Sequence, residues 1–415
     1  MHSRHTQAYR VTMAKFDDRL INGNQGAVLY LSRPANKTLS IRNATGTIEA
    51  SSGSAALVVN LASYEKNLDE LLQAAVALAQ QALDRWAIHG NMSRVLDPSE
   101  DRHILWWSDS SVGRSCRMHT SYGLTMTLSA EAQVQDSNGN IRPSLPPSPP
   151  AWHLSFRYFR LAQSTTDMVD AFRNYYLALE AILSTIEPPP LRADGRPAGK
   201  EKDWLDAAFR AAAKLVNFAD YAPPNTPNPD KFVRSDIYAN ARTLTFHAKA
   251  GALVMLPHEH QTRQRLRTSV KRLRQLYLDL TQASLGFRHI GGGGLTTSGF
   301  EMLASTYEGH AHLYVSSQPV QERRPGEPVT PDDLLAIPMF RSADQSDDTH
   351  VTFSGKIPLK DTSTRVRQFG VADQANTLIY EDLGATLDLE GFAHAEVVFD
   401  FRHDGASGTG IRHHS

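Results

Sequence analysis

The chain has 415 residues, and a typical size of about 150 residues per domain predicts about three domains. Forty-three Lys and Arg residues against 44 Asp and Glu residues give a formal charge of −1, which excludes a broadly basic nucleic-acid coat and a broadly acidic protein. Cys116 is the only cysteine, so an intrachain disulfide and four-cysteine zinc or iron–sulfur sites are excluded.

The sequence shows no export or membrane signal. The first twenty residues lack the apolar core of a signal peptide, and no run of about eighteen apolar residues occurs elsewhere. We therefore expect a cytoplasmic protein that does not enter a membrane.

Residues 1–141 show the pattern of an α+β domain of unknown role. Runs rich in Val, Leu, Tyr and Thr, bounded by Gly or Asn, predict strands that include residues 27–31, 55–61 and 122–128. Residues 64–88 carry apolar side chains at helical spacing and predict one long helix. We expect the apolar stripe of this helix to face the core of the domain.

The pattern changes after a proline-rich segment. Residues 142–151 read RPSLPPSPPA, which excludes a packed helix or a central strand and predicts a linker. Apolar residues then recur at intervals of three and four, which predicts an all-α four-helix bundle over residues 152–285. Its helices are expected at residues 165–186, 200–218, 231–249 and 258–285.

A second flexible segment follows the bundle. Four consecutive glycines have no preferred backbone conformation, and they predict a linker over residues 286–299. Alternating apolar and polar residues then predict a β-rich domain over residues 300–415. Its strands are expected at residues 311–316, 351–358, 376–381 and 394–402. The predicted fold is multidomain α+β, with a central four-helix bundle between an N-terminal α+β domain and a C-terminal β-rich domain.

Familiar ligand motifs fail on spacing. The glycine segment at residues 195–200 lacks one spacer of a P-loop, and Glu201 stands where that loop needs Ser or Thr. His258 and His260 would point about 200° apart on a helix, so a metal ion shared by the two would require a loop. We predict no metal and no cofactor.

Arg242 and His247 lie in the segment ARTLTFHAK on the predicted third helix. The spacing alone does not discriminate, because a chain of this composition contains an Arg followed by a His at similar spacing about four times by chance. An ion-pair partner and a partly buried His are the structural alternative for this pair.

The order of segments around the pair is more informative. Three segments follow each other along the chain. FRNYYLALEAILS lies in a long helix, IYANARTLTFHAKAG lies in the helix that carries Arg242 and His247, and RLRQLYLDL lies in a basic helix. In these segments the chain resembles the HEPN superfamily over residues 152–285, about one third of its length. Within the superfamily it is most similar to the ApeA-like branch and to proteins called methylamine utilization protein MauJ.

The resemblance implies a metal-independent endoribonuclease that works as a homodimer. By match to the family motif, Arg242 would neutralise a phosphate and His247 would act as acid or base. Thr243 stands where the family often has Asn, Asp or His, and both Thr243 and Asn240 can share the face of His247. Glu180 would orient Arg or His near the site, with a structural ion pair as the alternative.

Helix geometry adds a constraint to this site. Five positions rotate by about 500°, which leaves Arg242 and His247 about 140° apart on their helix. Two antiparallel copies of the helix could surround one phosphate, which is a physical reason to expect a symmetric homodimer.

The predicted fourth helix carries a dense cationic stretch with no acid inside it. Four residues in it are predicted to contact an RNA backbone: Arg263, Arg267, Lys271 and Arg274. A solvated helix face or an acidic partner surface explains the same stretch equally well. No preference for DNA can be inferred.

Three functions follow from these patterns. The first is a metal-independent endoribonuclease, acting as a regulated stress or defence effector whose flanking domains sense a trigger. The second is a non-catalytic dimerisation module that binds RNA or a nucleotide. The third is a dimerisation core between two ligand-sensing domains, without affinity for RNA.

Overall fold

The computed structural model places the chain in two compact units, one built from residues 1–128 together with residues 292–415 and the other from residues 129–291. The structure describes the whole chain except for residues 1–14, 17–18, 22, 63–66, 98–101, 110–112, 124–133, 136–140, 143–150, 166, 192, 194–197, 243–259, 288–296, 319–325, 330–333, 343–349, 360–364, 383–385 and 403–415. We call the unit built from residues 1–128 and 292–415 the terminal unit and the unit built from residues 129–291 the helical unit.

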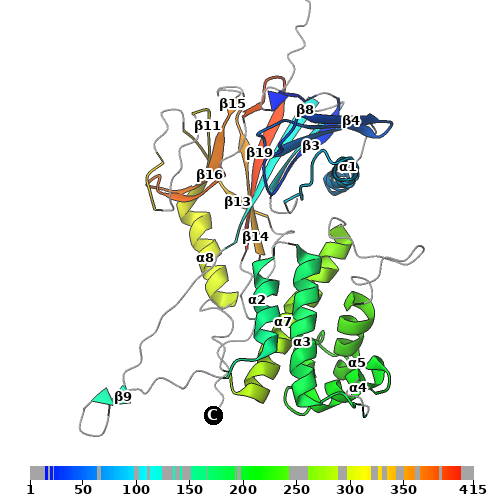
Figure 1. Ribbon diagram of the computed structural model, residues 1–415. Helices are drawn as coiled ribbons and strands as arrows, with labels where there is room; N and C mark the ends of the chain where they lie inside the picture. Colours follow the sequence, from blue (N-terminus) through cyan, green and yellow to red (C-terminus); the bar gives the residue numbers. More distant parts are fainter. Residues whose placement is uncertain are drawn as a thin grey trace, which may run out of the picture. The chain divides into compact units, whose positions relative to one another are not determined.

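A nine-stranded sheet with the order β13-β14-β19-β8-β7-β3-β6-β5-β4 dominates the terminal unit. Its strands are β3 (Gln25–Tyr30), β4 (Leu39–Asn43), β5 (Gly46–Ala50), β6 (Ala56–Leu61), β7 (Arg102–Asp109), β8 (Gly113–Gly123), β13 (Phe340–Arg341), β14 (His350–Ile357) and β19 (His394–Arg402). β8 and β19 pair in parallel, whereas the other neighbouring strands of this sheet pair antiparallel. Figure 1 shows these two strands, cyan and red, side by side.

Alternation along β19 explains why this strand occupies the middle of a sheet. Ala395, Val397, Phe399 and Phe401 are buried on one face, together with Cys116 and Met118 of β8. Glu396, Val398 and Asp400, which lie between them, are on the opposite face, because successive side chains of a strand alternate. β19 therefore has one apolar face that packs in the core and an opposite face that includes the polar side chains of Glu396 and Asp400.

The apolar face packs against a second layer. That layer contains α8 (Thr297–His310) and a four-stranded sheet of the order β12-β11-β16-β17. The strands of this sheet are β11 (Ala311–Ser316), β12 (Leu335–Ile337), β16 (Gln368–Asp373) and β17 (Leu378–Asp382). Thr120 of β8 and the Tyr380 hydroxyl of β17 share a hydrogen bond of 2.8 Å between the two sheets.

The opposite face of the large sheet is covered in part by α1 (Leu68–Ile88). Asn67 caps this helix by accepting from the Asp69 backbone N–H, which fixes its start four residues after the predicted one. The helix packs on β3, β5, β6 and β7. A further small sheet joins β1 (Lys15–Phe16), β2 (Arg19–Leu20), β15 (Arg365–Val366) and β18 (Leu387–Asp388).

The helical unit contains α2 (Leu154–Ser164), α3 (Met168–Ile186), α4 (Glu201–Ala212), η1 (Phe218–Tyr221), α5 (Pro229–Arg234), η2 (Ser235–Arg242) and α7 (His260–Leu285), with a short hairpin of β9 (Val134–Gln135) and β10 (Ile141–Arg142). α7 packs against α3, and both helices bury apolar side chains in one core. None of the helices in the described part of the chain is both long enough and apolar enough to cross a membrane.

The predicted fold class is wrong in two respects. The two flanking domains do not exist as such, because strands from both ends of the chain form the nine-stranded sheet. The helical unit is not a four-helix bundle either: α2 precedes the predicted first helix, and residues 231–242 of the predicted third helix form α5 followed by the π-helix η2, while its residues 243–249 lie outside the described residues. A search at 3.6 residues per turn does not anticipate the wider π turn.

The element boundaries show where local patterns succeeded. The helix predicted at residues 258–285 is α7, and the helix predicted at residues 165–186 is α3 with a later start. α4 ends at Ala212, six residues before the predicted end at 218. α8 begins inside the predicted linker 286–299, and most of the predicted linker 142–151 lies outside the described residues.

We predict that Phe399→Ala, which empties a 2% exposed position of β19, destabilises the terminal unit by about 3–5 kcal/mol. Because β8 pairs with β19, hydrogen exchange should then accelerate at the β8 amides as well as in residues 292–415. Phe340→Ala, at a side chain that is 65% exposed, is the matched control and should change stability by less than about 0.5 kcal/mol. Acceleration confined to residues 292–415 would indicate two separate domains.

Candidate functional site

The predicted catalytic pair falls at the edge of the described structure. Arg242 is the last residue of η2, and Asn240 lies in the same π-helix, but the structure describes only the backbone of these two residues. Thr243 and His247 lie outside the described residues. The geometry of the pair therefore stays a prediction.

The predicted supporting acid, Glu180, is half-buried on α3. Its backbone carbonyl accepts a hydrogen bond of 2.8 Å from the Ser184 hydroxyl one turn later. Tyr175 and Tyr176 of the same helix are only 5% and 3% exposed. Both rings therefore belong to the core and do not form a surface on which bases could stack.

η2, the helix that contains Arg242, is fixed to α7 by a polar contact. Asp236 forms an ion pair with Arg272 and accepts a hydrogen bond of 3.2 Å from Ser269. The Arg272 guanidinium also lies over the Phe232 ring, 5.0 Å from its centroid. Arg272 thus has a structural role, which separates it from the other cations of α7.

Other cations of α7 lie beside its buried apolar stripe. Leu266, Leu273, Leu276, Tyr277 and Leu280 are buried. Arg267 and Lys271 are exposed and Arg274 is half-buried. Their spacing of four and three residues places them on one face of the helix. We call Arg267, Lys271 and Arg274 the α7 cationic row; Arg265 is exposed beside it, and the side chain of Arg263 lies outside the described residues.

Arg274 is the member of the row nearest the core. Burial raises the pKa of Tyr175, and the positive charge of Arg274 partly opposes this increase. Arg274 is half-buried, whereas Arg267 and Lys271 are exposed.

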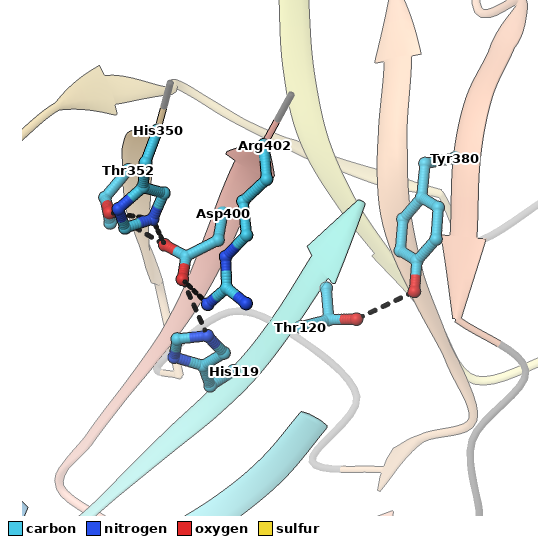
Figure 2. Close-up of polar contacts among 7 residues, drawn as sticks. All are labelled: His119, Thr120, His350, Thr352, Tyr380, Asp400 and Arg402. Carbon is cyan, nitrogen blue, oxygen red and sulfur yellow. Dashed lines mark hydrogen bonds and ion pairs between the residues drawn. The ribbon is translucent and has the colours of Figure 1, made fainter. Parts of the chain in front are cut away.

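A second polar cluster, which the sequence did not predict, lies in the terminal unit. It consists of Asp400 on β19, His119 on β8, His350 and Thr352 on β14, and Arg402 on β19, and we call it the Asp400 cluster. Figure 2 shows both imidazoles and the guanidinium around the carboxylate. The strand register explains the assembly, since Thr352 lies opposite Asp400 and His350 lies opposite Arg402.

Four side chains contact the two oxygens of Asp400. Its Oδ1 accepts from the Thr352 hydroxyl at 2.7 Å and lies 3.1 Å from Nε2 of His350. Its Oδ2 accepts from Arg402 at 2.8 Å and lies 3.1 Å from Nε2 of His119. The carboxylate is 3% exposed, so this shell replaces the water that a charged group would otherwise need.

Electrostatics keep this buried carboxyl ionised. Burial alone would raise the pKa of Asp400, but hydrogen bonds and charge interactions with His119 and His350 lower it well below its usual range. The ring of His119 also stacks on that of His103, its register partner on β7, with centroids 4.6 Å apart. Three histidines and one aspartate thus form a row across four strands.

Among the described residues, no group of three or more His, Cys, Asp and Glu side chains is arranged to hold a metal ion. Burial raises the pKa of Cys116, on the apolar face of β8, to about 12, so this thiol is not an activated nucleophile.

Comparison with known proteins finds no match to a protein-family model, to a curated protein or to a solved structure.

We predict that Asp400→Asn destabilises the terminal unit by about 3 kcal/mol at pH 7, because it leaves the Arg402 guanidinium without its counter-charge. The folded-state pKa of Asp400 is depressed, so its contribution is complete above the unfolded-state value of about 3.9 and is lost as the pH falls below it. The difference in unfolding free energy between wild type and variant should therefore shrink from pH 5 to pH 3. A difference that stays constant over this range would contradict the assignment.

Proposed function

We propose that the helical unit binds RNA along the α7 cationic row and cleaves it without a metal ion. The observation that supports this proposal best is the outward face of α7, where Arg267 and Lys271 are exposed on a helix whose opposite face is buried. Successive cations four residues apart are separated by about 6 Å along the helix, which suits contact with consecutive phosphates of a flexible strand. Because the net charge of the whole chain is close to zero, an RNA would have to be attracted by a local group of cations such as this row.

The position of η2 supports a cleavage site beside this row. Asp236 ties η2 to Ser269 and Arg272 of α7, and Arg242 ends the same π-helix. An RNA held on α7 would therefore run close to the π-helix that ends at Arg242.

The proposed reaction is an in-line displacement at phosphorus. The ribose 2′-oxygen loses its proton to one imidazole and attacks the adjacent phosphorus, while the bond to the 5′-oxygen breaks and that oxygen takes up a proton. Arg242 would neutralise the added negative charge, and His247 would transfer protons near neutral pH. Two copies of the pair, one from each subunit of a homodimer, would supply the base and the acid.

The binding step predicts a salt-dependent complex. Arg267→Glu and Lys271→Glu should each weaken the binding of single-stranded RNA at least about tenfold, because each reverses a charge that contacts phosphate. The slope of log K against log salt should fall by about 0.7 for each lost contact, as measured by fluorescence anisotropy of the full chain. Lys202→Glu, at an exposed lysine of α4, is the control and should bind like wild type. Equal binding by all variants would exclude the α7 cationic row.

The cleavage step predicts activity in EDTA. RNA incubated with the full chain should yield products ending in a 2′,3′-cyclic phosphate and a 5′-hydroxyl, and Arg242→Ala or His247→Ala should lower the rate at least about 100-fold with RNA affinity retained. Cleavage that persists in both variants would exclude these residues. RNA binding without products in wild type would make the helical unit a binding module only.

A further inference from the structure

Trp152 is the exposed aromatic side chain in the described part of the helical unit. It is 67% exposed, whereas Tyr175 and Tyr176 of α3 are buried in the core. Leu154, at 45% exposure, continues this apolar surface into the first turn of α2. An indole is a large flat ring, and leaving it in water is unfavourable. Trp152 is therefore available to stack on a flat partner.

The segment that carries Trp152 is held in place by the cap of α2. His153 caps this helix, and its Nδ1 accepts a hydrogen bond of 3.2 Å from the Ser155 backbone N–H. Its other ring nitrogen, Nε2, lies 3.0 Å from the Thr185 hydroxyl of α3. The Tyr277 hydroxyl of α7 donates to the Ser155 hydroxyl at 2.9 Å. Because the backbone next to Trp152 is fixed to α3 and α7, a contact with this ring costs little ordering entropy.

α2 lies beside α7 through aromatic contacts. Phe159 stacks on Tyr277 with ring centroids 4.9 Å apart, and Phe156 contacts Phe287, just after α7, with centroids 5.2 Å apart. A later position on α2 thus meets an earlier position on α7, so the two helices run antiparallel. The α7 cationic row precedes Tyr277 and therefore lies on the side towards which α2 ends.

Cations from both helices lie on the open side of this contact. On α7, Arg274 and Lys271 lie about 60° and 120° around the helix from Tyr277, in the direction away from the buried leucines. On α2, the exposed Arg160 lies about 100° from Phe159, in the direction away from the buried side of that helix. Since α3 packs against both helices and closes the other side, these cations face the same open side.

This surface is positively charged. α2 contains Arg157 and Arg160, both exposed, and no acidic residue. The first acids of α3 have other partners, because Asp167 caps that helix and Asp170 pairs with Arg173 at 3.2 Å. An exposed indole beside such cations suits a polyanion with flat faces, which is the chemistry of a single-stranded nucleic acid.

An anionic membrane is the other partner that tryptophan, leucine and arginine side chains can contact. An interfacial helix buries a full apolar face in the lipid. Phe159 of α2 already packs against the core of the helical unit, and Phe156 already contacts Phe287. α2 therefore lacks the free apolar face that a membrane surface requires, and RNA is the partner that the surface fits better.

We propose that Trp152 stacks on an unpaired base of an RNA whose phosphates contact Arg157, Arg160 and the α7 cationic row. The inference rests on the proposed function and deepens it, because it assigns single-stranded RNA as the substrate class. In a duplex the bases are stacked on each other, so a protein-surface indole has no base face to bind. Trp152 binds the substrate and takes no part in proton transfer.

The experiment measures the anisotropy of a labelled 2′-O-methyl oligouridylate with the full chain. This strand lacks the 2′-hydroxyl that the proposed reaction needs, so binding is measured without cleavage. Trp152→Ala should weaken binding at least about fivefold, as expected for the loss of one stacked base, and Trp152→Phe should stay within about twofold of wild type. Binding of the same strand annealed to 2′-O-methyl oligoadenylate should change less than about twofold in either variant.

Intrinsic fluorescence reports the stacking directly. Trp86 and Trp106 are 3% and 0% exposed, and Trp107 and Trp204 are partly buried, so Trp152 is the indole that a ligand meets first. The oligouridylate should quench the emission of wild type. This quenching should be absent in Trp152→Phe, which still binds the strand, and the comparison does not depend on the folding of Trp152→Ala.

Charge variants and controls locate the strand. Arg160→Glu should weaken binding of the single strand and of the duplex alike, at least about fivefold, because it reverses the charge at a phosphate contact. Arg210→Glu, at an exposed arginine of α4, and Leu215→Ala, at a 44% exposed leucine, should bind like wild type. Thermal unfolding identifies the folded variants, and affinities are compared among these.

Three results would overturn the proposal: full affinity of Trp152→Ala for the single strand, equal losses for strand and duplex, or binding by wild type without quenching. Emission that responds to phosphatidylserine vesicles but not to RNA would also overturn it and would assign the surface to a membrane. If Lys271→Glu weakens RNA binding and Trp152→Ala does not, this inference alone fails. If wild type does not bind the strand, the proposed function fails with it.

Discussion

The parallel pairing of β8 with β19 is the constraint on which the terminal unit depends. It is the junction at which the N-terminal strands of the chain meet the C-terminal ones within a single sheet. Parallel neighbours need a long connection, and here that connection contains the whole helical unit. The helical unit is therefore an insertion between two strands that pair, which explains why both ends of the chain share one core.

The same pairing creates the polar row on the opposite face of the sheet. Register places Asp400 beside β8 on one side and opposite Thr352 of β14 on the other, so one carboxylate contacts residues of three adjacent strands. A buried carboxylate is stable only where donors surround it, and the Asp400 cluster supplies them from both ends of the sequence.

The sequence predicted what local periodicity determines. α7 lies close to its expected bounds, and Arg267 and Lys271 are exposed on it. α2 was missed because it buries Ser155 and Ala162 while exposing Leu154 and Leu161, which inverts the expected pattern.

The nine-stranded sheet and the Asp400 cluster could not be predicted, since strand alternation gives the face of each residue but not the partner of each strand. Polar residues at alternate positions of β19 were the available signal for the cluster, and they were uninformative as long as the strands that pair with β19 were unknown.

The most direct test of the pairing between β8 and β19 uses Cys116, the only cysteine, whose register partner on β19 is Ala395. Refolding Ala395→Cys in a glutathione redox buffer should form an intramolecular disulfide between residues 116 and 395, detectable by peptide mass spectrometry. A monomeric protein that refolds with both thiols free, or links only to other chains, would contradict the shared sheet.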